Sequence, residues 1–326
     1  MEDRSWTIGF WNCAGIANKD VEFWETIKEW DVVILIETWL EEKGWDRIRD
    51  RMPKGYRWEA QLAKRKNKKG RAMGGMIMGV KKGILGKEGG IRVEEEKEGI
   101  IMAECKGGKL NWRIVGVYVN GDMEAKIKDL RPWLEEIGEG RRTIIGGDFN
   151  ARTGEEVGSK REEEDEEGEE KRRSKDKKSN AEGNRLLETL RETGWTILNG
   201  TIEGDKDGEF TYTGARGETV IDYVIVEEEG REEIIRMEVG DRIESDHHPL
   251  IVEMRGGGEQ YIIEERRRKT TPRGDWSEQG RKDFIEGISW RRSKNKKLNA
   301  DMKMILEEFR KGLERGNKKG RKSKKK

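Results

Sequence analysis

Apolar segments rich in β-branched residues recur along the first 255 residues, with turn-forming residues between them. Some are nearly continuous apolar runs, as expected for strands buried on both faces, and others alternate with a period of two. The segments are residues 6–11, 32–37, 56–63, 73–80, 99–106, 110–119, 143–149, 208–213, 219–227, 234–241 and 249–254. This pattern predicts many strands arranged in two sheets.

Helix-forming segments are fewer and lie between the strands. We expect helices at about 20–29, 123–138 and 183–193, the second with Ile127, Leu130, Leu134 and Ile137 on one face. Strands that outnumber helices, with helices at intervals, favour an α/β sandwich over a helical bundle. The expected class is therefore α/β (α+β).

Charged residues make up 41% of the chain and gather in blocks outside the apolar segments. Residues 155–182 hold almost nothing that could enter a core, so we expect a charged, mobile insertion there. From residue 256 onward the chain has 23 Lys or Arg and 11 Asp or Glu, whereas the whole chain has a net charge of +1. We expect one acidic domain over residues 1–255 and a basic linker and tail over 256–326, with a candidate helix at 298–315.

The cysteines and the apolar runs limit the class of protein further. Cys13 and Cys105 are isolated, which argues against a disulfide framework and against a cysteine zinc site. The N-terminus has no signal-peptide pattern, and no apolar run approaches the roughly 18 residues of a membrane span. We expect a soluble intracellular chain with no membrane partner and no small-molecule cofactor.

Both histidines of the chain lie in one segment, ESDHHPL, as His247 and His248. Histidine is the usual proton-transfer group near neutral pH, so a pair that follows Asp246 and precedes a strand suggests a site. The same residues suit a plain turn, in which Ser, Asp and Pro act through turn chemistry. The segment alone leaves both interpretations open.

A second polar cluster, GGDFN at 146–150, follows the apolar run TII. The glycines would let the backbone turn tightly, and Asp148 and Asn150 would project in the same direction from an extended segment. A carboxylate beside an amide can orient and deprotonate a water, although a strand-ending Asx turn would look the same. Asn12, Glu37 and Asp222 also stand at strand ends or inside apolar strands, where burial without partners is costly. Each of these three alone could be a satisfied structural residue.

Together these polar residues predict a metal site. Most come from strand ends, which a layered sheet fold can gather at one edge: Asn12, Glu37, Asp148, Asn150, Asp222, Asp246 and His247. Carboxylate and amide oxygens are the ligands that Mg²⁺ or Mn²⁺ prefers. Zinc is disfavoured, because the chain offers two adjacent histidines and no clustered cysteine.

Six motifs, taken in order, resemble those of the endonuclease/exonuclease/phosphatase superfamily. They are WNCAG at 11–15, ETWL at 37–40, VYV at 117–119, GGDFNART at 146–153, VIDYV at 220–224 and SDHHPL at 245–250. The resemblance covers about residues 5–255. It implies a four-layered α/β/β/α sandwich of two mostly antiparallel sheets, and Mg²⁺-dependent (or Mn²⁺-dependent) phosphodiester hydrolysis.

The resemblance also implies roles on the metal side of the site. Glu37 would hold the metal with Asn12 beside it, and Asp246 would complete the site. Asp148 would orient or deprotonate the attacking water, which Asn150 would help to position.

On the phosphate side, the resemblance implies that His247 contacts the scissile phosphate and stabilises its developing charge. Asp222 would hold the His247 ring in its tautomer and orientation. Tyr118 would reach the phosphate from the opposite wall. His248 would be a neighbour without a catalytic role.

Within the superfamily, the sequence of residues 174–201 and 208–226 resembles that of the endonuclease of a LINE-type, non-LTR retrotransposon. This implies a DNA-nicking enzyme of nuclear or nucleocytoplasmic location. The DNA-binding candidates are Thr211 and the basic loop residues Lys66, Lys68, Lys69 and Arg71. Two alternatives stay open: a catalytically inactive nucleic-acid-binding remnant, and an abasic-site endonuclease or phosphatase of the same superfamily.

Overall fold

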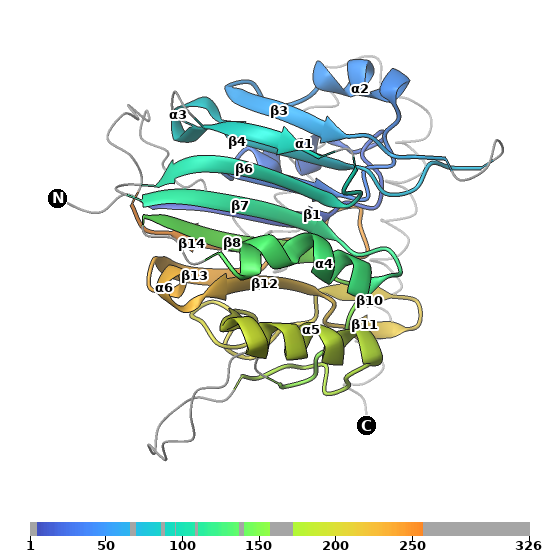
Figure 1. Ribbon diagram of the computed structural model, residues 1–326. Coiled ribbons are helices and arrows are strands. Elements are labelled where there is room, and N and C mark those ends of the chain that lie inside the picture. The colour runs from blue at the N-terminus through green and yellow to red at the C-terminus, as the bar shows by residue number, and fades with distance from the viewer. Residues whose placement is uncertain are drawn as a thin grey trace, which may run out of the picture. The chain divides into compact units, whose positions relative to one another are not determined.

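The computed structural model describes residues 5–65, 70–85, 89–94, 96–107, 110–136, 140–156 and 172–256. Within them, two six-stranded sheets form the centre of the fold (Figure 1). The first sheet has the order β13 (Ile234–Val239), β14 (Leu250–Met254), β1 (Trp6–Asn12), β2 (Val32–Ile36), β4 (Met76–Lys81) and β3 (Tyr56–Gln61). The second has the order β5 (Gly90–Val93), β6 (Ile100–Gly107), β7 (Leu110–Tyr118), β8 (Arg141–Asp148), β12 (Asp222–Glu227) and β9 (Trp195–Ile197). A separate hairpin pairs β10 (Tyr212–Gly214) with β11 (Gly217–Thr219).

The three helices that the sequence predicts are present, and each begins at a polar cap. They are α1 (Val21–Ile27), α4 (Met123–Leu134) and α5 (Ala181–Thr193). The capping side chains of Asp20, Asp122 and Asn180 each accept a hydrogen bond from the backbone N–H three residues later. The sequence did not predict α2 (Glu42–Arg49), because Ile48 is its one buried residue. Two one-turn helices, α3 (Lys82–Leu85) and α6 (Glu228–Arg231), complete the described set.

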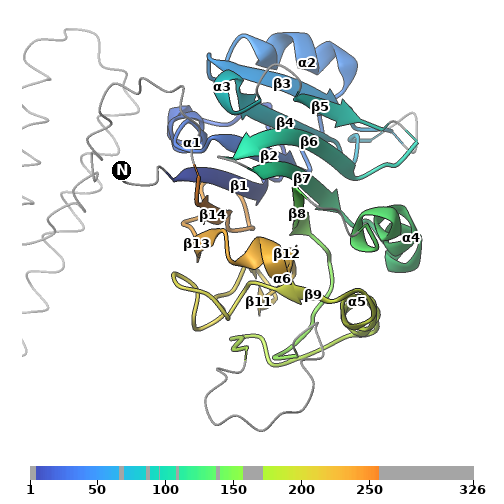
Figure 2. The ribbon, with the colours of Figure 1, turned by 60° about the vertical axis from the view of Figure 1, so that its left-hand side comes forward.

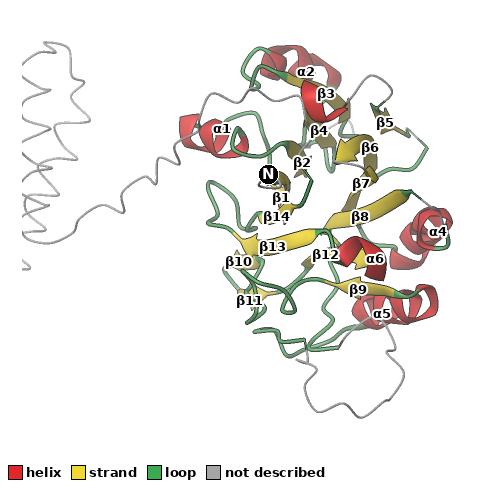
Figure 3. Ribbon diagram, turned by 90° about the vertical axis from the view of Figure 1, so that its left-hand side faces the viewer, coloured by secondary structure: helices red, strands yellow, loops and turns green. Residues whose placement is uncertain are grey.

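The sheets and helices stack in four layers. The two sheets share one core, in which Phe10 and Ile34 of the first sheet pack with Ile144 of the second. Helices α1 and α2 cover the outer face of the first sheet, and α4 and α5 cover that of the second. The strands lie between helix α1 on one side and helices α4 and α5 on the other (Figure 2; Figure 3). The expected α/β/β/α sandwich is therefore confirmed.

Strand direction brings chemically active residues to one edge of the sandwich. β1 and β2 run parallel, as do β7 and β8, while all other adjacent strands of the two sheets pair antiparallel. The carboxyl ends of these four strands lie at the same edge as the amino ends of β12 and β14. Asn12, Tyr118 and Asp148 end their strands there, and Asp222 begins β12 directly opposite Asp148.

The glycines of the GGDFN motif allow close approach rather than a tight turn. A Cβ on Gly146 would lie 2.8 Å from the ring of Phe10 in the facing sheet. Gly147 has φ +144°, and a Cβ there would lie 2.1 Å from the carbonyl oxygen of Val117. The expectation of a turn was wrong, because both residues lie inside β8 and are constrained by packing.

Part of the segment expected to be a charged insertion belongs to the folded unit. Arg172, Ser174 and Asp176 are buried, and α5 begins at Ala181. Their buried polar groups have partners, since the Arg172 guanidinium donates to the Asn199 and Gly154 carbonyls and Asp176 pairs with Arg152. Ile137, residues 157–171 and the basic tail from residue 257 lie outside the described residues. Among the described helices, none combines the length and apolar character needed to cross a membrane.

Candidate active site

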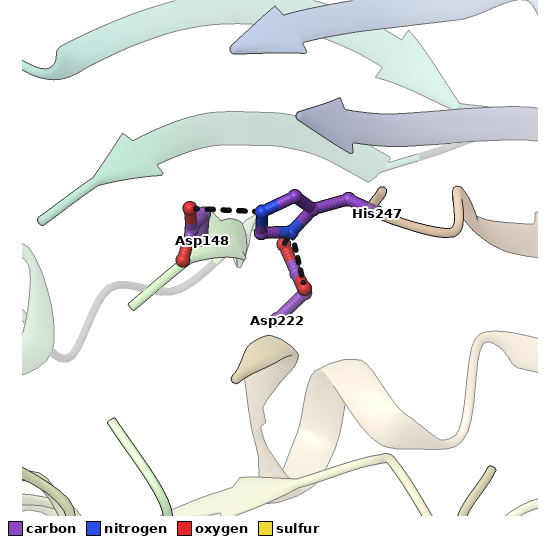
Figure 4. A group of neighbouring side chains, drawn as sticks. All are labelled: Asp148, Asp222 and His247. Carbon is purple, nitrogen blue, oxygen red and sulfur yellow. Dashed lines mark hydrogen bonds and ion pairs between the residues drawn. The ribbon is translucent and has the colours of Figure 1, made fainter. Parts of the chain in front are cut away.

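Three buried side chains, Asp148, Asp222 and His247, face one another at this edge (Figure 4). His247 comes from the loop before β14, and its Nδ1 lies 3.1 Å and 3.0 Å from the two carboxylate oxygens of Asp222. Its Nε2 lies 4.0 Å from Oδ2 of Asp148. Because a carboxylate only accepts, Nδ1 carries a proton and the ring is held with Nε2 directed toward Asp148.

The close charges change the protonation of this group. Burial disfavours the charged form of His247, but the negative charges of Asp222 and Asp148 outweigh burial and raise the pKa of His247 to about 9. Burial, together with the charge of Asp222, raises the pKa of Asp148 to about 7. At neutral pH the imidazole is therefore protonated, while Asp148 titrates where it can accept a proton.

Asn12 joins the two sheets at the site. Its Nδ2 donates to Oδ2 of Asp148 at 2.8 Å, and its Oδ1 accepts the backbone N–H of Ala14 at 3.1 Å. These two partners fix which end of the amide faces Asp148. The other Asp148 oxygen accepts the backbone N–H of Asn150 at 2.9 Å. The carboxylate is thus held from both sides.

Glu37 follows β2 and lies beside this group. One of its carboxylate oxygens accepts the hydroxyl of Tyr118, and the other accepts the indole N–H of Trp39 at 3.2 Å. Tyr118 is the strand neighbour of Asp148, so its hydrogen bond to Glu37 places that carboxylate at the same edge as the buried acids. Burial and the bond to Glu37 raise the pKa of Tyr118, which therefore keeps its proton and acts as a donor.

A protein-family model described as endonuclease-reverse transcriptase matches residues 112–251, which include Asp148, Asp222 and His247. The endonuclease domain of TRAS1, a telomere-specific non-LTR retrotransposon, superposes with a TM-score of 0.54 at 18% identity, covering 78% of this chain and all of that domain. The chain has the fold of this endonuclease domain, and its residues 112–251 resemble the matched family. It resembles a non-LTR retrotransposon endonuclease.

Two other nuclease structures share the fold. The AP endonuclease LMAP from Leishmania major superposes with a TM-score of 0.56 at 17% identity, over 77% of this chain and 88% of that one. The 3'-5' exonuclease NExo from Neisseria meningitidis superposes with a TM-score of 0.51 at 16% identity, over 76% of this chain and 99% of that one. A comparison with curated protein sequences finds no match. Identities this low carry the fold and leave the substrate open.

Three residues that the sequence analysis did not single out hold His247 in this site. The hydroxyl of Ser245 donates to the Asn12 carbonyl at 2.7 Å and accepts the His247 backbone N–H at 3.1 Å. The indole of Trp11 donates to the His247 carbonyl at 3.0 Å. The ring of Tyr212 meets the imidazole edge to face, with centroids 4.9 Å apart. Ser245 lies in the SDHHPL motif, a signal that could have identified it, but the contacts of Trp11 and Tyr212 depend on folding and have no local signal.

Thr211 does not line a DNA groove in this structure, contrary to the expectation. Its side chain is fully buried, and its hydroxyl accepts the backbone N–H groups of Ile221 at 3.1 Å and Asp222 at 3.0 Å. A residue without exposed surface cannot contact a nucleic acid directly. Thr211 instead fixes the backbone from which Asp222 reaches His247.

Two other predicted residues lie at the rim. Asn150 is exposed, has φ +48° and donates its Nδ2 to the Val119 carbonyl at 2.9 Å. Asp246 is exposed, and its charge helps to raise the pKa of His247. His248 lies with Nδ1 3.0 Å from the Gly240 carbonyl and Nε2 3.2 Å from the Thr213 hydroxyl, contacts that connect loops.

Of the predicted basic loop, Lys66, Lys68 and Lys69 lie outside the described residues. Arg71 is described and exposed, and its guanidinium carbon lies 3.4 Å from the ring centroid of Trp39. Because Trp39 donates to Glu37, Arg71 is connected to the site through one intervening residue.

The donors present fit a divalent cation. Asp148, Asp222 and His247 offer ligand atoms within 4.8 Å of one another, but both oxygens of Asp222 contact the protonated Nδ1, so the charged imidazole is its partner. Glu37 has two carboxylate oxygens that each accept one hydrogen bond and keep a second lone pair. The buried negative charge that raises the pKa of Asp148 is a charge that a cation would offset. Glu37 and Asp148 supply carboxylate oxygens of the kind that Mg²⁺ or Mn²⁺ takes, whereas the Asn12 amide faces Asp148 with its Nδ2 and its oxygen accepts from Ala14.

Proposed function

We propose that this chain is a divalent-metal-dependent phosphodiesterase that nicks DNA. The observation that carries the proposal is the buried Asp222 and His247 pair, aimed at an Asp148 whose pKa is near 7. Glu37 and Tyr118 complete the same edge. A proton acceptor beside a fixed cationic donor is the combination that hydrolysis of a phosphodiester requires.

In this proposal Asp148 accepts the proton of the attacking water. Its Oδ2 is fixed by the Asn12 amide and its Oδ1 by the Asn150 backbone, so the carboxylate keeps one orientation throughout the reaction. A general base of this kind contributes about 100-fold to 10,000-fold to a rate. Asn150 stands at the rim, where a water or phosphate oxygen can reach it.

His247 donates Nε2–H to a phosphate oxygen as negative charge builds up on it. Asp222 stabilises the cationic ring and fixes its tautomer, and Tyr118 offers a second, neutral donor. A divalent cation held by Glu37 with Asp148 and Asn12 would supply a Lewis acid that offsets the same charge. Asp246 adds negative charge at the rim of this cation site.

Supercoiled plasmid tests the proposal. Purified protein with Mg²⁺ should convert supercoiled plasmid to open circles, and EDTA should stop the conversion. Asp148→Asn and His247→Gln should each abolish nicking, whereas His248→Gln, the matched control at the adjacent position, should retain it. Nicking that survives both active-site substitutions would refute the proposal.

The same assay separates the alternatives. A catalytically inactive nucleic-acid-binding remnant would bind the plasmid without cutting it. The similarity to the Leishmania major AP endonuclease makes abasic DNA the relevant competitor substrate. Faster cleavage of an abasic duplex than of undamaged plasmid would make this chain a repair-type enzyme. We propose undamaged DNA as the substrate, with a nuclear location, on the resemblance to the retrotransposon endonuclease.

A further inference from the structure

The Glu37 carboxylate depends on an unusual backbone segment. Glu37 and Trp39 both have positive φ, +53° and +54°, a conformation that residues other than glycine rarely adopt. Such conformations persist where the surrounding structure imposes them, and they cluster at functional sites. The two residues are also joined by the hydrogen bond from the indole to the carboxylate.

Backbone bonds hold this segment on both sides. The N–H of Gly15 donates to the Glu37 carbonyl at 2.8 Å, which ties the segment to the loop after β1. On the other side, the N–H of Trp39 donates to the Gly74 carbonyl at 3.0 Å, and that of Thr38 donates to the Gly75 carbonyl at 3.1 Å. The strained conformation is therefore imposed by its two neighbouring loops.

The fold leaves space for the Trp39 ring beside Gly15. Gly15 has φ +93°, and a Cβ there would lie 2.4 Å from Cε3 of Trp39, so the ring occupies space that only glycine leaves open. The guanidinium of Arg71 lies 3.4 Å from the ring centroid. A cation over an indole face attracts the ring and withdraws electron density from it, which makes the N–H a stronger donor.

We propose that Trp39, backed by Arg71, is a positioning residue that holds the Glu37 carboxylate in the orientation in which it binds the divalent cation. This inference rests on the proposed function, because it concerns the same metal site. Tyr118 fixes one carboxylate oxygen and Trp39 the other, so the carboxylate keeps one orientation and each oxygen keeps a lone pair that a metal can take. Groups that orient a metal ligand in this way typically change metal affinity or activity about 10-fold to 100-fold when removed.

Indole NMR tests the hydrogen bond without requiring catalysis. In the full-length chain labelled with ¹⁵N-Trp, Trp39→Phe identifies the Trp39 indole signal by its loss. Glu37→Gln should shift that signal upfield. Added Mn²⁺ should broaden it before the signal of Trp6, whose indole donates to the Arg255 carbonyl at the opposite end of β1, about 20 Å away at the usual rise per residue. A Trp39 signal that neither shifts in Glu37→Gln nor broadens with added Mn²⁺ would overturn the inference.

Metal dependence supplies the second test. Trp39→Phe and Arg71→Gln should each raise the Mg²⁺ concentration for half-maximal nicking about tenfold, with little change in rate at saturating Mg²⁺. The control is Arg65→Gln, because Arg65 pairs with Glu41 and its loss removes the same charge from the same loop. If Arg71→Gln changes the KM for DNA but not the Mg²⁺ requirement, Arg71 contacts a phosphate. That result would overturn the inference that Arg71 supports Trp39.

The two proposals fail in different ways. Broadening of the Trp39 signal by Mn²⁺ in a protein that never nicks DNA would contradict the proposed function and support the positioning role. If Trp39→Phe nicks DNA with an unchanged Mg²⁺ requirement, the proposed function is supported and the positioning role is contradicted. Thermal unfolding of each variant separates both results from loss of the fold.

Discussion

At the scale of single residues, the site follows from charges placed close together in a buried space. Asp222 keeps His247 protonated, and the same negative charge raises the pKa of its neighbour Asp148. His247 is thereby held in the protonated state that its proposed role requires, and Asp148 becomes a stronger base that titrates near neutral pH. The pair of pKa values makes a direct prediction about pH.

We predict a bell-shaped dependence of the nicking rate on pH. Below the pKa of Asp148, about 7, the carboxyl is protonated and cannot accept a proton, and a bound cation would shift this limb to lower pH. Above the pKa of His247, about 9, the ring is neutral and loses the charge that stabilises the phosphate. Single-turnover rates measured from pH 5 to 10 check both limbs.

Asp222→Asn is the matched variant for this profile. Removing its charge lowers the pKa of His247 and also that of Asp148, so both limbs should move to lower pH. The maximal rate should fall about 100-fold or more, because the ring loses its orientation and charge partner. A profile that is unchanged in this variant would contradict the assigned roles.

Thr211→Val tests whether Thr211 positions Asp222 or contacts DNA. The substitution keeps the shape but removes the acceptor for two backbone N–H groups, which should lower the free energy of unfolding by about 2 kcal/mol. We expect slower nicking with unchanged DNA affinity, and recovery of both rate and stability in Thr211→Ser. If Thr211→Val binds DNA more weakly but keeps its full stability, Thr211 contacts DNA after all.

Sequence reasoning found the polar side chains that the structure brings together, because they interrupt apolar strands at their ends. Asn12, Asp148 and Asp222 could be placed at one edge from strand order alone. It missed Trp11, Tyr212 and Ser245, and it misassigned Thr211, because their roles arise from loop contacts between distant segments. No local pattern in the chain specifies such contacts.

At the scale of elements, strand direction determines which ends meet. The parallel pairs β1 with β2 and β7 with β8 bring carboxyl ends together in each sheet, and Asn12 bonds Asp148 across the two. The sequence predicted the long strands, whose apolar runs are unmistakable. It missed β5, β9 and β11, which have three or four residues each, too few to show a period.

Gly147→Ala should damage the edge through β8. The added Cβ would lie 2.1 Å from the Val117 carbonyl oxygen at φ +144°, so β8 must move away from β7. We expect the free energy of unfolding to fall by about 2 kcal/mol or more, with a lower nicking rate as Asp148 shifts.

Gly90→Ala in β5 is the control for this substitution. A Cβ at Gly90 meets nothing within 4 Å, so chemical denaturation should give nearly the wild-type midpoint. If Gly147→Ala also unfolded at that midpoint, the packing account of the GGDFN motif would be wrong.

At the scale of the whole molecule, charge is divided unevenly along the chain. Residues 256–326 carry 23 basic and 11 acidic side chains in a chain with a net charge of +1, so residues 1–255 are acidic as a whole. An acidic domain should repel DNA at long range, and a basic segment in the same chain would offset this repulsion.

Removing residues 257–326 should therefore weaken DNA binding more than catalysis. We expect the KM for plasmid to rise and the dependence of binding on salt to become shallower, while kcat stays close to that of the full chain. Fluorescence anisotropy over 50 to 300 mM NaCl measures the slope. An unchanged slope would show that the tail does not contact DNA.

The central claim is that Glu37, Asp148, Asn12 and His247, distant in sequence, serve one divalent cation and one phosphodiester at a single edge. Anomalous diffraction from crystals grown with Mn²⁺ tests it most directly. We predict one strong peak in contact with the Glu37 carboxylate, on the Asp148 side of Tyr118. A Mn²⁺ ion bound elsewhere, or Glu37 turned away from the ion, would contradict it.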